Sequence, residues 1–422
     1  MKFDGPDGIS ACILPFSAGR ESLPPGTREA IGGKAFELAR LRGAGFPVPD
    51  GFALSWEFFG PWRARIEAGE DLSSLRLDAE RKELLSEAVQ EFGLRNGQHG
   101  GLFAVRSSSS DEDGQGASFA GGYETVLGVH ARDLEEAVRA CFASAYGPRA
   151  RAYRRRQGLA SAHPRIAVLV QGLVDADQAG VAFSIDPVSN CYDEAVVSAA
   201  RGLGEKVVQG MVETDVFTLD KVSGRLVSQK TSGSNPCLSQ GQLKALLDLV
   251  KAVEADFGRP VDIEWAFQGD ALFLLQARPV TAWLPLPPEM LTKPGEPRKL
   301  YANATLIEQG VEGSLSALGA DFLTLVLKSM AGSLGEGGVG LDGTTFTAGG
   351  RYYTHVSNAV RLGGRKMAFA PGSMGDETVS AILDSIDLEQ YLPRELPSAL
   401  KKMKRKMPLL LLTIGMPTLR AL

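Results

Sequence analysis

The sequence predicts an α+β fold, with helices and strands alternating over the first 280 residues. Apolar residues recur at helical spacing in several segments, and short β-rich runs lie between them. Five prolines then interrupt this pattern between residues 285 and 297, and such a stretch is typical of a stiff linker between domains. We therefore place a first domain at residues 1–281, a linker at 282–299 and a second, mainly helical domain at 300–422.

The helices of the first domain are predicted from apolar residues at helical spacing. The first predicted helix starts at Gly32-Gly33-Lys34 and stops at Gly43. Ser55 and Ser239 are expected to cap the helices that follow them. Further helices are expected over residues 78–92 and 133–156, the latter with a break at Gly147-Pro148.

The strands are predicted from short runs rich in β-branched and aromatic residues. They are expected at residues 52–54, 102–105, 166–170, 181–183, 195–198 and 216–219. A loop of small residues should run from Ser107 to Gly122, and a hairpin should close the domain with strands at 261–267 and 271–278. In the second domain a glycine-rich loop is expected at Gly332–Gly350.

Composition argues against several classes of function. The net charge of −5 speaks against nucleic-acid binding, which needs an excess of Lys and Arg. The four cysteines form no C-x-x-C pair, so neither a zinc ribbon nor a redox dithiol is expected. There is no signal-peptide pattern and no apolar run long enough to cross a bilayer, so we expect a soluble, cytoplasmic protein without a membrane partner. G-x-S-x-G and H-E-x-x-H motifs are also lacking.

Two features near the start of the chain favour a polyphosphate ligand. Gly32-Gly33-Lys34 at a helix start combines close backbone approach, a helix N-terminus and a positive charge. Arg106, followed by four serines, offers a bidentate fork for phosphate. Each has a structural alternative, a flexible turn in the first case and a salt-bridged arginine in the second.

Two further features extend this pattern. The loop Ser118–Thr125 holds small residues whose N–H groups could surround phosphate oxygens. In the hairpin, alternation and the turn place Glu264 opposite Gln276, and a carboxylate with an amide oxygen suits Mg²⁺. Arg278 would add positive charge beside them. An ordinary exposed hairpin face is the alternative, but the four features together favour a polyphosphate.

Residues 27–281 resemble the nucleotide-binding module of phosphoenolpyruvate synthase and pyruvate, phosphate dikinase, which is shared with rifampicin phosphotransferases. The matching strings, in the family's order, are GGKAFELARLRGAGFPVPDGFALS, FAVRSSSSDEDGQGASFAGGYET, VLVQGLV, GVAFSIDP, RGLGEKVVQG and DIEWAF followed by LLQARPV. The resemblance implies an ATP-grasp fold with ATP and Mg²⁺ as cofactors. Residues 300–422 are similar to the start of the family's middle domain, through LYANATLIEQGVEGSLSALG and GRYYTHVSNAVRL.

The resemblance also implies a role for each matching residue. The residues expected to contact phosphate during catalysis are Lys34, Arg106 and Arg278. Those expected in the loop over the phosphates are Ala120, Gly121 and Gly122, the last of which stands where phosphoenolpyruvate synthases commonly have glutamine. The hinge whose backbone reads the adenine edge matches Gln171, Gly172, Leu173 and Val174, and the Mg²⁺ ligands match Glu264 and Gln276.

In this family ATP is converted to AMP and a phosphoryl group passes to a histidine in a Gly-Gly-x-x-Ser-His-type motif on a separate carrier domain. None of the four histidines here stands in such a motif. We therefore expect an ATP-binding phosphotransferase component whose carrier domain is missing or acts in trans. A non-catalytic nucleotide-binding subunit or remnant, and a rifampicin-type phosphotransferase fragment, stay open. The matching strings argue against a carboxylate–amine ligase, and no oligomeric state or final acceptor is predicted.

Overall fold

The computed structural model describes residues 12–16, 23–95, 101–109, 123–156, 164–202, 213–280, 286–292, 297–303, 314–331, 339–364 and 386–405. The chain divides into two compact units, Met1–Trp283 and Leu284–Leu422. Each unit is described by itself.

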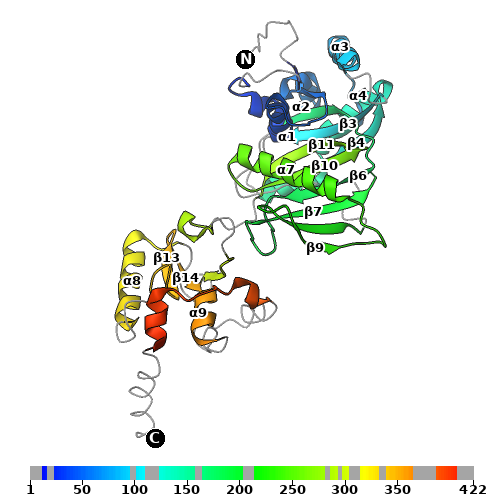
Figure 1. The fold of residues 1–422 in the computed structure, drawn as a ribbon. Helices are drawn as coiled ribbons and strands as arrows, with labels where there is room; N and C mark the ends of the chain where they lie inside the picture. Colours follow the sequence, from blue (N-terminus) through cyan, green and yellow to red (C-terminus); the bar gives the residue numbers. More distant parts are fainter. Residues whose placement is uncertain are drawn as a thin grey trace. The chain divides into compact units, whose positions relative to one another are not determined.

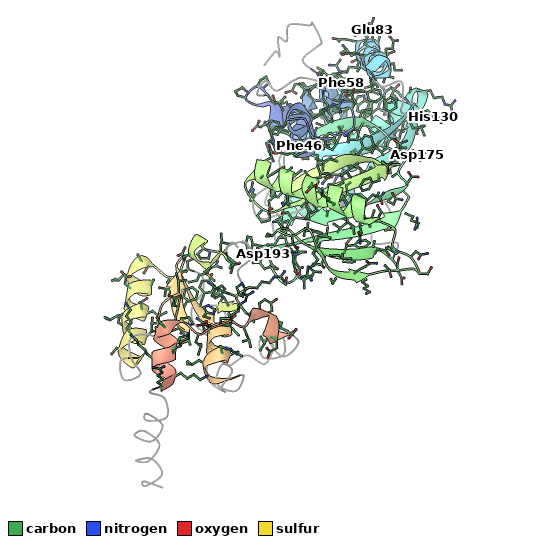
Figure 2. The ribbon with its side chains drawn as sticks, viewed as in Figure 1. Phe46, Phe58, Glu83, His130, Asp175 and Asp193 are labelled. Carbon is green, nitrogen blue, oxygen red and sulfur yellow. The ribbon has the colours of Figure 1, made fainter. Side chains whose placement is uncertain are left out.

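The first unit contains two antiparallel sheets (Figure 1). One, which we call the β3 sheet, has the strand order β1-β2-β5-β3-β4. Its strands are β1 (Ile13–Pro15), β2 (Gly51–Leu54), β3 (Leu102–Ser109), β4 (Thr125–His130) and β5 (Ile166–Gly172). An aromatic core that includes Phe58, Phe59, Trp62 and Phe142 packs against it, and Figure 2 labels Phe58 within this part of the unit.

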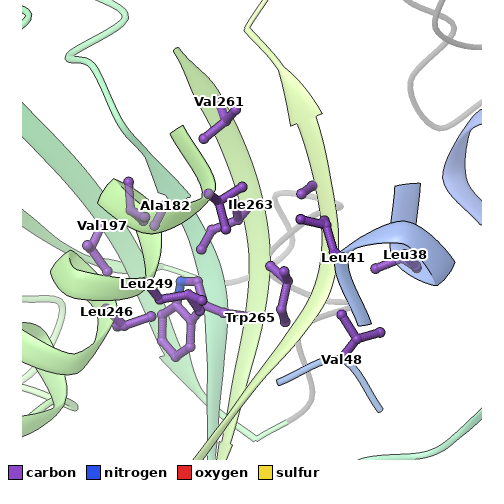
Figure 3. Packing of buried hydrophobic residues seen from close by; sticks show 14 of the residues in the cluster. Leu38, Leu41, Val48, Ala182, Val197, Leu246, Leu249, Val261, Ile263 and Trp265 are labelled. Carbon is purple, nitrogen blue, oxygen red and sulfur yellow. The ribbon is translucent and has the colours of Figure 1, made fainter. Parts of the chain in front are cut away.

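The other sheet, which we call the β10 sheet, has the order β11-β10-β6-β7-β8-β9. Its strands are β6 (Gln178–Phe183), β7 (Glu194–Arg201), β8 (Asp215–Asp220), β9 (Leu226–Lys230), β10 (Val261–Gln268) and β11 (Ala271–Pro279). One face is covered by apolar side chains of two helices, among them Leu246 of α7 and Leu38 of α1, which gather around Trp265 and its neighbours (Figure 3). The opposite face of β10 carries the residues of the predicted site.

The helices of the first unit match most of the predicted boundaries. They are α1 (Thr27–Gly43), η1 (Trp56–Phe59), α2 (Gly60–Glu67), η2 (Leu72–Ser74), α3 (Ala79–Arg95), η3 (Ala131–Asp133), α4 (Leu134–Ser144), α5 (Pro148–Arg156) and α7 (Gln240–Phe257). The break at Gly147-Pro148 is confirmed, and Ser239 forms a capping box with Gln242. Ser55 occupies the N-cap position of η1, as predicted, but its side chain makes no capping hydrogen bond, so the predicted capping interaction is wrong.

The end of β3 differs from the prediction. The strand expected at 102–105 continues to Ser109, and β4 follows where no strand was predicted. Ser107 and Ser109 are buried, and their hydroxyls donate to the carbonyls of Glu124 (3.2 Å) and Arg165 (3.0 Å). Small polar residues that suggested a loop are therefore hydrogen-bonded inside the sheet.

The second unit combines helices with a small sheet. Its strands, β12 (Tyr301–Asn303), β13 (Thr345–Ala348) and β14 (Arg351–His355), lie in the order β12-β14-β13. Its helices are η4 (Pro288–Met290), α8 (Ala317–Ala331), α9 (Val356–Gly363) and η7 (Leu388–Tyr391). The loop predicted at Gly332–Gly350 contains β13, because Phe346 and Ala348 alternate inward against Tyr353 and Met290.

Met290 lies in the segment predicted to be linker, yet it is buried in the second unit's core. The α+β class predicted from the sequence is confirmed, since both units combine helices with antiparallel sheet. Across the described parts of the chain, none of the helices is both long and apolar enough to span a bilayer.

Candidate functional site

The β10–β11 hairpin brings the predicted metal ligands face to face. Glu264 pairs with Gln276 and Asp262 pairs with Arg278, so the register predicted from the turn is confirmed. Glu264 is partly exposed and Gln276 is buried. One carboxylate and one amide oxygen therefore meet on a single face of the hairpin.

A β-bulge shifts the register just beyond this pair. Glu264 pairs with Gln276 while Trp265 pairs with Leu274, which leaves Leu275 as the extra residue. The backbone oxygen of Leu275 accepts a hydrogen bond from Arg106 Nη1 at 3.4 Å. Bulges turn backbone groups out of a strand ladder and are frequent next to active sites. This one directs a carbonyl at an arginine of the other sheet.

Arg106 connects the two sheets at this point. It lies within β3, and its Nη1 is 3.4 Å from Glu264 Oε2. The side chain is only 14% exposed, and its Nε is buried without a hydrogen-bond partner among the described residues. A buried guanidinium with long contacts and an unsatisfied N–H is costly unless something else binds it. The geometry is suited to an additional anionic group.

Arg278 is held by a carboxylate for which the sequence predicted no role. Its Nε donates to both carboxylate oxygens of Asp262 at 2.9 Å, and its Nη2 donates to Oδ2 at 2.8 Å. Asp262 is 7% exposed. The pair fixes the plane of the Arg278 guanidinium beside the Glu264–Gln276 pair. The two-residue alternation of Asp262 and Glu264 was the signal from which this contact could have been found.

Lys34 lies beside the part of β3 that carries Arg106. The N–H of the next residue, Ala35, donates to Ser108 Oγ at 3.1 Å.

Burial and the Glu124 carboxylate raise the pKa of the Cys141 thiol to about 12, while the Lys34 ammonium lowers it. Cys141 itself contacts the carbonyl of Val105 at 3.4 Å. With so high a pKa, Cys141 is protonated near neutral pH and is not a nucleophile.

A small apolar patch lies on the same face of β10, beside the predicted hinge. Its buried residues are Val174, Ala179 and Ala266, with Ala176, Phe273 and Leu275 packed against them. Within the hinge, the N–H groups of Gly172 and Leu173 donate to the carbonyls of Asp50 and Leu102, both at 3.0 Å. Gln171 is buried, and its Nε2 contacts the Pro49 carbonyl at 3.4 Å. Recognition of an adenine edge would therefore fall to the other backbone groups of the segment.

The donor set of the hairpin fits Mg²⁺. Where residues are described, no group of three or more His, Cys, Asp or Glu side chains is placed to hold a metal. Mg²⁺ is commonly bound through one or two protein oxygens, with phosphate and water completing its shell. Glu264 and Gln276 are such a pair.

The predicted loop residues Ala120, Gly121 and Gly122 lie outside the described residues.

The chain has relatives among known proteins. It is 35% identical over 297 residues to the prodigiosin synthesizing transferase PigC of Serratia marcescens (63% of this chain, 32% of the relative). It is 34% identical over 303 residues to the rifampicin phosphotransferase of Streptomyces sviceus (61% and 35%). It is 30% identical over 318 residues to a probable phosphoenolpyruvate synthase of Methanocaldococcus jannaschii (64% and 27%). The chain spans about a third of the length of these relatives.

Among solved structures, the chain is similar to the ATP-grasp ligase PsnB complexed with a precursor peptide and AMPPNP. The identity is 18% and the TM-score 0.25, over 60% of this chain and 52% of that chain. A likeness at this TM-score supports no inference about the site.

The family match covers the hairpin and Arg106. The family described as "Pyruvate phosphate dikinase, AMP/ATP-binding domain" matches residues 63–235 and 227–293. These ranges begin after α1, which carries Lys34, and together make up just over half of the chain. The chain therefore belongs to the family of pyruvate phosphate dikinase AMP/ATP-binding domains.

Proposed function

We propose that the first unit binds Mg-ATP where the β3 sheet meets the β10–β11 hairpin, in the manner of an ATP-grasp domain, and starts a phosphoryl transfer. The observation that carries this proposal is the order of residues along one face of β10. Ala266 belongs to the apolar patch, Glu264 pairs with Gln276 as the proposed metal ligand, and Asp262 holds Arg278. Successive residues on this face are about 6.6 Å apart.

This order matches the polarity of a nucleotide. A base is apolar and flat, so it fits beside the patch around Val174 and Ala266. The phosphates carry the negative charge, so they fit farther along the strand, between Arg106 and Arg278. The family supports the choice of ligand, because its description names AMP and ATP.

The residues of the chain would act by positioning and by charge. The contacts of Arg106 Nη1 with Glu264 Oε2 and with the Leu275 carbonyl are both 3.4 Å long, and its Nε has no partner among the described residues, so Arg106 can turn from the carboxylate to a phosphate oxygen. Glu264 and Gln276 would hold Mg²⁺, which supplies neutralising charge to the phosphate oxygens when bound. Asp262 keeps Arg278 in one orientation towards the same group.

We further propose that ATP and water give AMP and free phosphate from the γ position, while the β-phosphoryl group passes to a histidine outside this chain, on a carrier domain. His355 is 3% exposed, and its Nδ1 accepts from the Asn358 N–H at 3.3 Å, so it serves as a helix cap. His130 ends β4, the edge strand of the β3 sheet (Figure 2), and stands outside the family's carrier motif. His99 and His163 also stand outside that motif and lie beyond the described residues.

The test is a reconstituted transfer. The chain is mixed with ATP, Mg²⁺ and a carrier domain that bears the Gly-Gly-x-x-Ser-His-type motif, and AMP and phosphohistidine are measured together. The proposal predicts both products, in equal amounts, and neither with Glu264→Ala. ATP binding without AMP would instead support the alternative of a non-catalytic nucleotide-binding subunit.

A second candidate, a fragment of a rifampicin-type phosphotransferase, is favoured by the 34% identity to such an enzyme. The same reaction with rifampicin added separates it from the first. Phosphorylated rifampicin would identify the drug as the final acceptor. If phosphohistidine forms but rifampicin is not phosphorylated, the drug is not the final acceptor.

A further inference from the structure

We propose that Ser108 is a positioning residue that fixes Lys34 relative to Arg106. It is not itself expected to contact the ligand. The inference rests on the proposed ATP site, since it concerns the spacing of the two cations that would meet one polyphosphate.

The first observation is that α1 is interrupted immediately before Lys34. Gly32 has φ 77° and ψ 166°, which is not helical, so the helix starts again at Gly33. A helix start leaves backbone N–H groups without intrahelical partners. One of them, the N–H of Ala35, donates to Ser108 Oγ at 3.1 Å. Ser108 thus performs, from another strand, the task of an N-cap side chain.

The second observation is the closeness of the two backbones. A Cβ atom at Gly32 would lie 2.4 Å from Ser108 Oγ, 2.5 Å from its carbonyl carbon and 2.6 Å from its carbonyl oxygen. With its positive φ as well, this position accepts only glycine without rearrangement. Ser108 has no exposed surface. The contact between α1 and β3 is therefore close, buried and specific in its geometry.

The third observation is where this contact lies. Ser108 and Arg106 are two residues apart on β3, so their side chains leave the same face of the strand, about 6.6 Å apart along it. Lys34 directly precedes Ala35. The hydrogen bond from the Ala35 N–H to Ser108 Oγ therefore links the backbone segment that carries Lys34 to the one that carries Arg106. A small shift of α1 along β3 would change the spacing of the cations, and such shifts strongly affect binding and reaction.

The neighbouring serines do not share this role. Ser107 Oγ donates to the Glu124 carbonyl and Ser109 Oγ to the Arg165 carbonyl. Ser109 is as buried as Ser108, at 1% and 0% exposure, and sits one position along the same strand. Ser109→Ala is therefore a matched control that removes a buried serine hydroxyl without touching α1.

The experiment measures affinities for Mg-ATP and for adenosine by titration calorimetry. The variants are Ser108→Ala, Ser109→Ala, Lys34→Ala and the double variant of Ser108 and Lys34. We expect Ser108→Ala to weaken ATP binding about tenfold, the effect of one hydrogen bond, and to leave adenosine binding unchanged. When Lys34 is already replaced by alanine, Ser108→Ala should weaken ATP binding no further, because Ser108 acts through Lys34.

Several outcomes would overturn the inference. Equal losses for ATP and adenosine, full additivity with Lys34→Ala, or the same effect from Ser109→Ala would each show a general structural role. If Ser108→Ala does not fold, Ser108→Cys replaces it, because a cysteine side chain has a similar shape and its sulfur is only a weak hydrogen-bond acceptor. The same changes in ATP and adenosine affinity are then expected. Failure of the wild-type chain to bind ATP would refute the proposed function itself, which is a separate result from these.

Discussion

The two ends of the β10 sheet differ in how closely their carboxylates are paired with hydrogen-bond donors. At the β8–β9 end, Asp215 is 2% exposed and accepts from Ser232 N (2.8 Å), Ser232 Oγ (2.9 Å) and Cys237 N (2.7 Å). Beyond the other end of β8, Glu254 of α7 accepts from Lys221 Nζ at 2.5 Å and from Ser184 Oγ at 3.0 Å. These carboxylates are closely paired within the chain.

At the β10–β11 end, Glu264 meets Arg106 at 3.4 Å, a long contact, and Arg106 keeps a buried Nε without a described partner. The two ends belong to the same sheet, and the side chains of Glu254 and Glu264 are equally exposed, at 21%. The difference supports the proposal that the hairpin groups receive a ligand while those of the β8–β9 end stabilise the fold, because a buried group that lacks close partners is costly to keep. Substitutions at the β8–β9 end should therefore change stability, and those at the hairpin should change binding.

The largest expected effect is that of Glu264→Ala. Removal of the metal-binding carboxylate should lower phosphoryl transfer from Mg-ATP by about 100- to 1,000-fold, the range found when one transition-state contact is removed. The free energy of unfolding should change by only about 1 kcal/mol, since the ion pair between Arg106 and Glu264 is long. Transfer assays and denaturant unfolding measure the two effects.

The control for Glu264→Ala is Asp270→Asn, which changes an exposed carboxylate in the turn of the same hairpin. Asp270→Asn should leave both the rate of phosphoryl transfer and the free energy of unfolding unchanged. A Glu264 variant that loses stability but keeps its activity would contradict the division between the two ends of the sheet.

Asp215→Ala should lower the stability of the fold without changing ATP binding. It leaves two backbone N–H groups and the Ser232 hydroxyl without their acceptor, which should cost about 2–3 kcal/mol of unfolding free energy. ATP affinity should be unchanged in the folded protein. Asp248→Ala, at an exposed position of α7, is the matched control for stability. A change in ATP affinity with Asp215→Ala would mean that the two ends are coupled.

The hairpin shows how far the sequence alone could lead. Glu264 and Gln276 could be paired from a clear turn and two-residue alternation, which are local signals. The same register pairs Asp262 with Arg278, a contact that was not predicted from the sequence. The bulge at Leu275 and the contact of Arg106 with Glu264 depend on how two sheets pack, which no local pattern reports.

The serines after Arg106 show the opposite case. Ser107, Ser108 and Ser109 have the composition of a loop, and β3 nevertheless includes them. Each hydroxyl finds a partner distant in sequence, and the close approach of Gly32 needs a small residue at 108. Tertiary contacts thus override local propensity. Lys34 was predicted from the local pattern Gly32-Gly33-Lys34 and from the family resemblance, but the contact of its helix with β3 is a tertiary one that no local pattern reports.

Asp262→Asn tests the hairpin's one closely paired carboxylate. Its bonds to Arg278 are 2.8–2.9 Å, so it resembles the β8–β9 end while lying at the site. We expect a neutral partner to loosen Arg278 and to weaken ATP binding about tenfold, equivalent to about 1.4 kcal/mol. The double variant with Arg278→Ala should bind no more weakly than Arg278→Ala alone. If Asp262→Asn lowers affinity further in that background, Asp262 acts on the ligand directly.

The smallest expected effect concerns pH and Asp215. Burial alone would raise the pKa of Asp215, but hydrogen bonds from Ser232 and Cys237 hold that pKa below its ordinary value. Its ionised form is thus favoured more in the folded than in the unfolded chain. The resulting stability is present above the unfolded pKa of about 3.9 and is lost as the pH falls through the lower folded value.

Asp215→Asn cannot lose a charge on acidification, so its deficit relative to wild type should be constant near neutral pH and should shrink below about pH 4. Denaturant midpoints of both proteins, measured from about pH 7 to about pH 3, report this difference. A deficit for Asp215→Asn that widens in acid would mean that the Asp215 carboxylate is not stabilised by its neutral donors, and the contrast between the two ends of the sheet would fail at its best-defined residue.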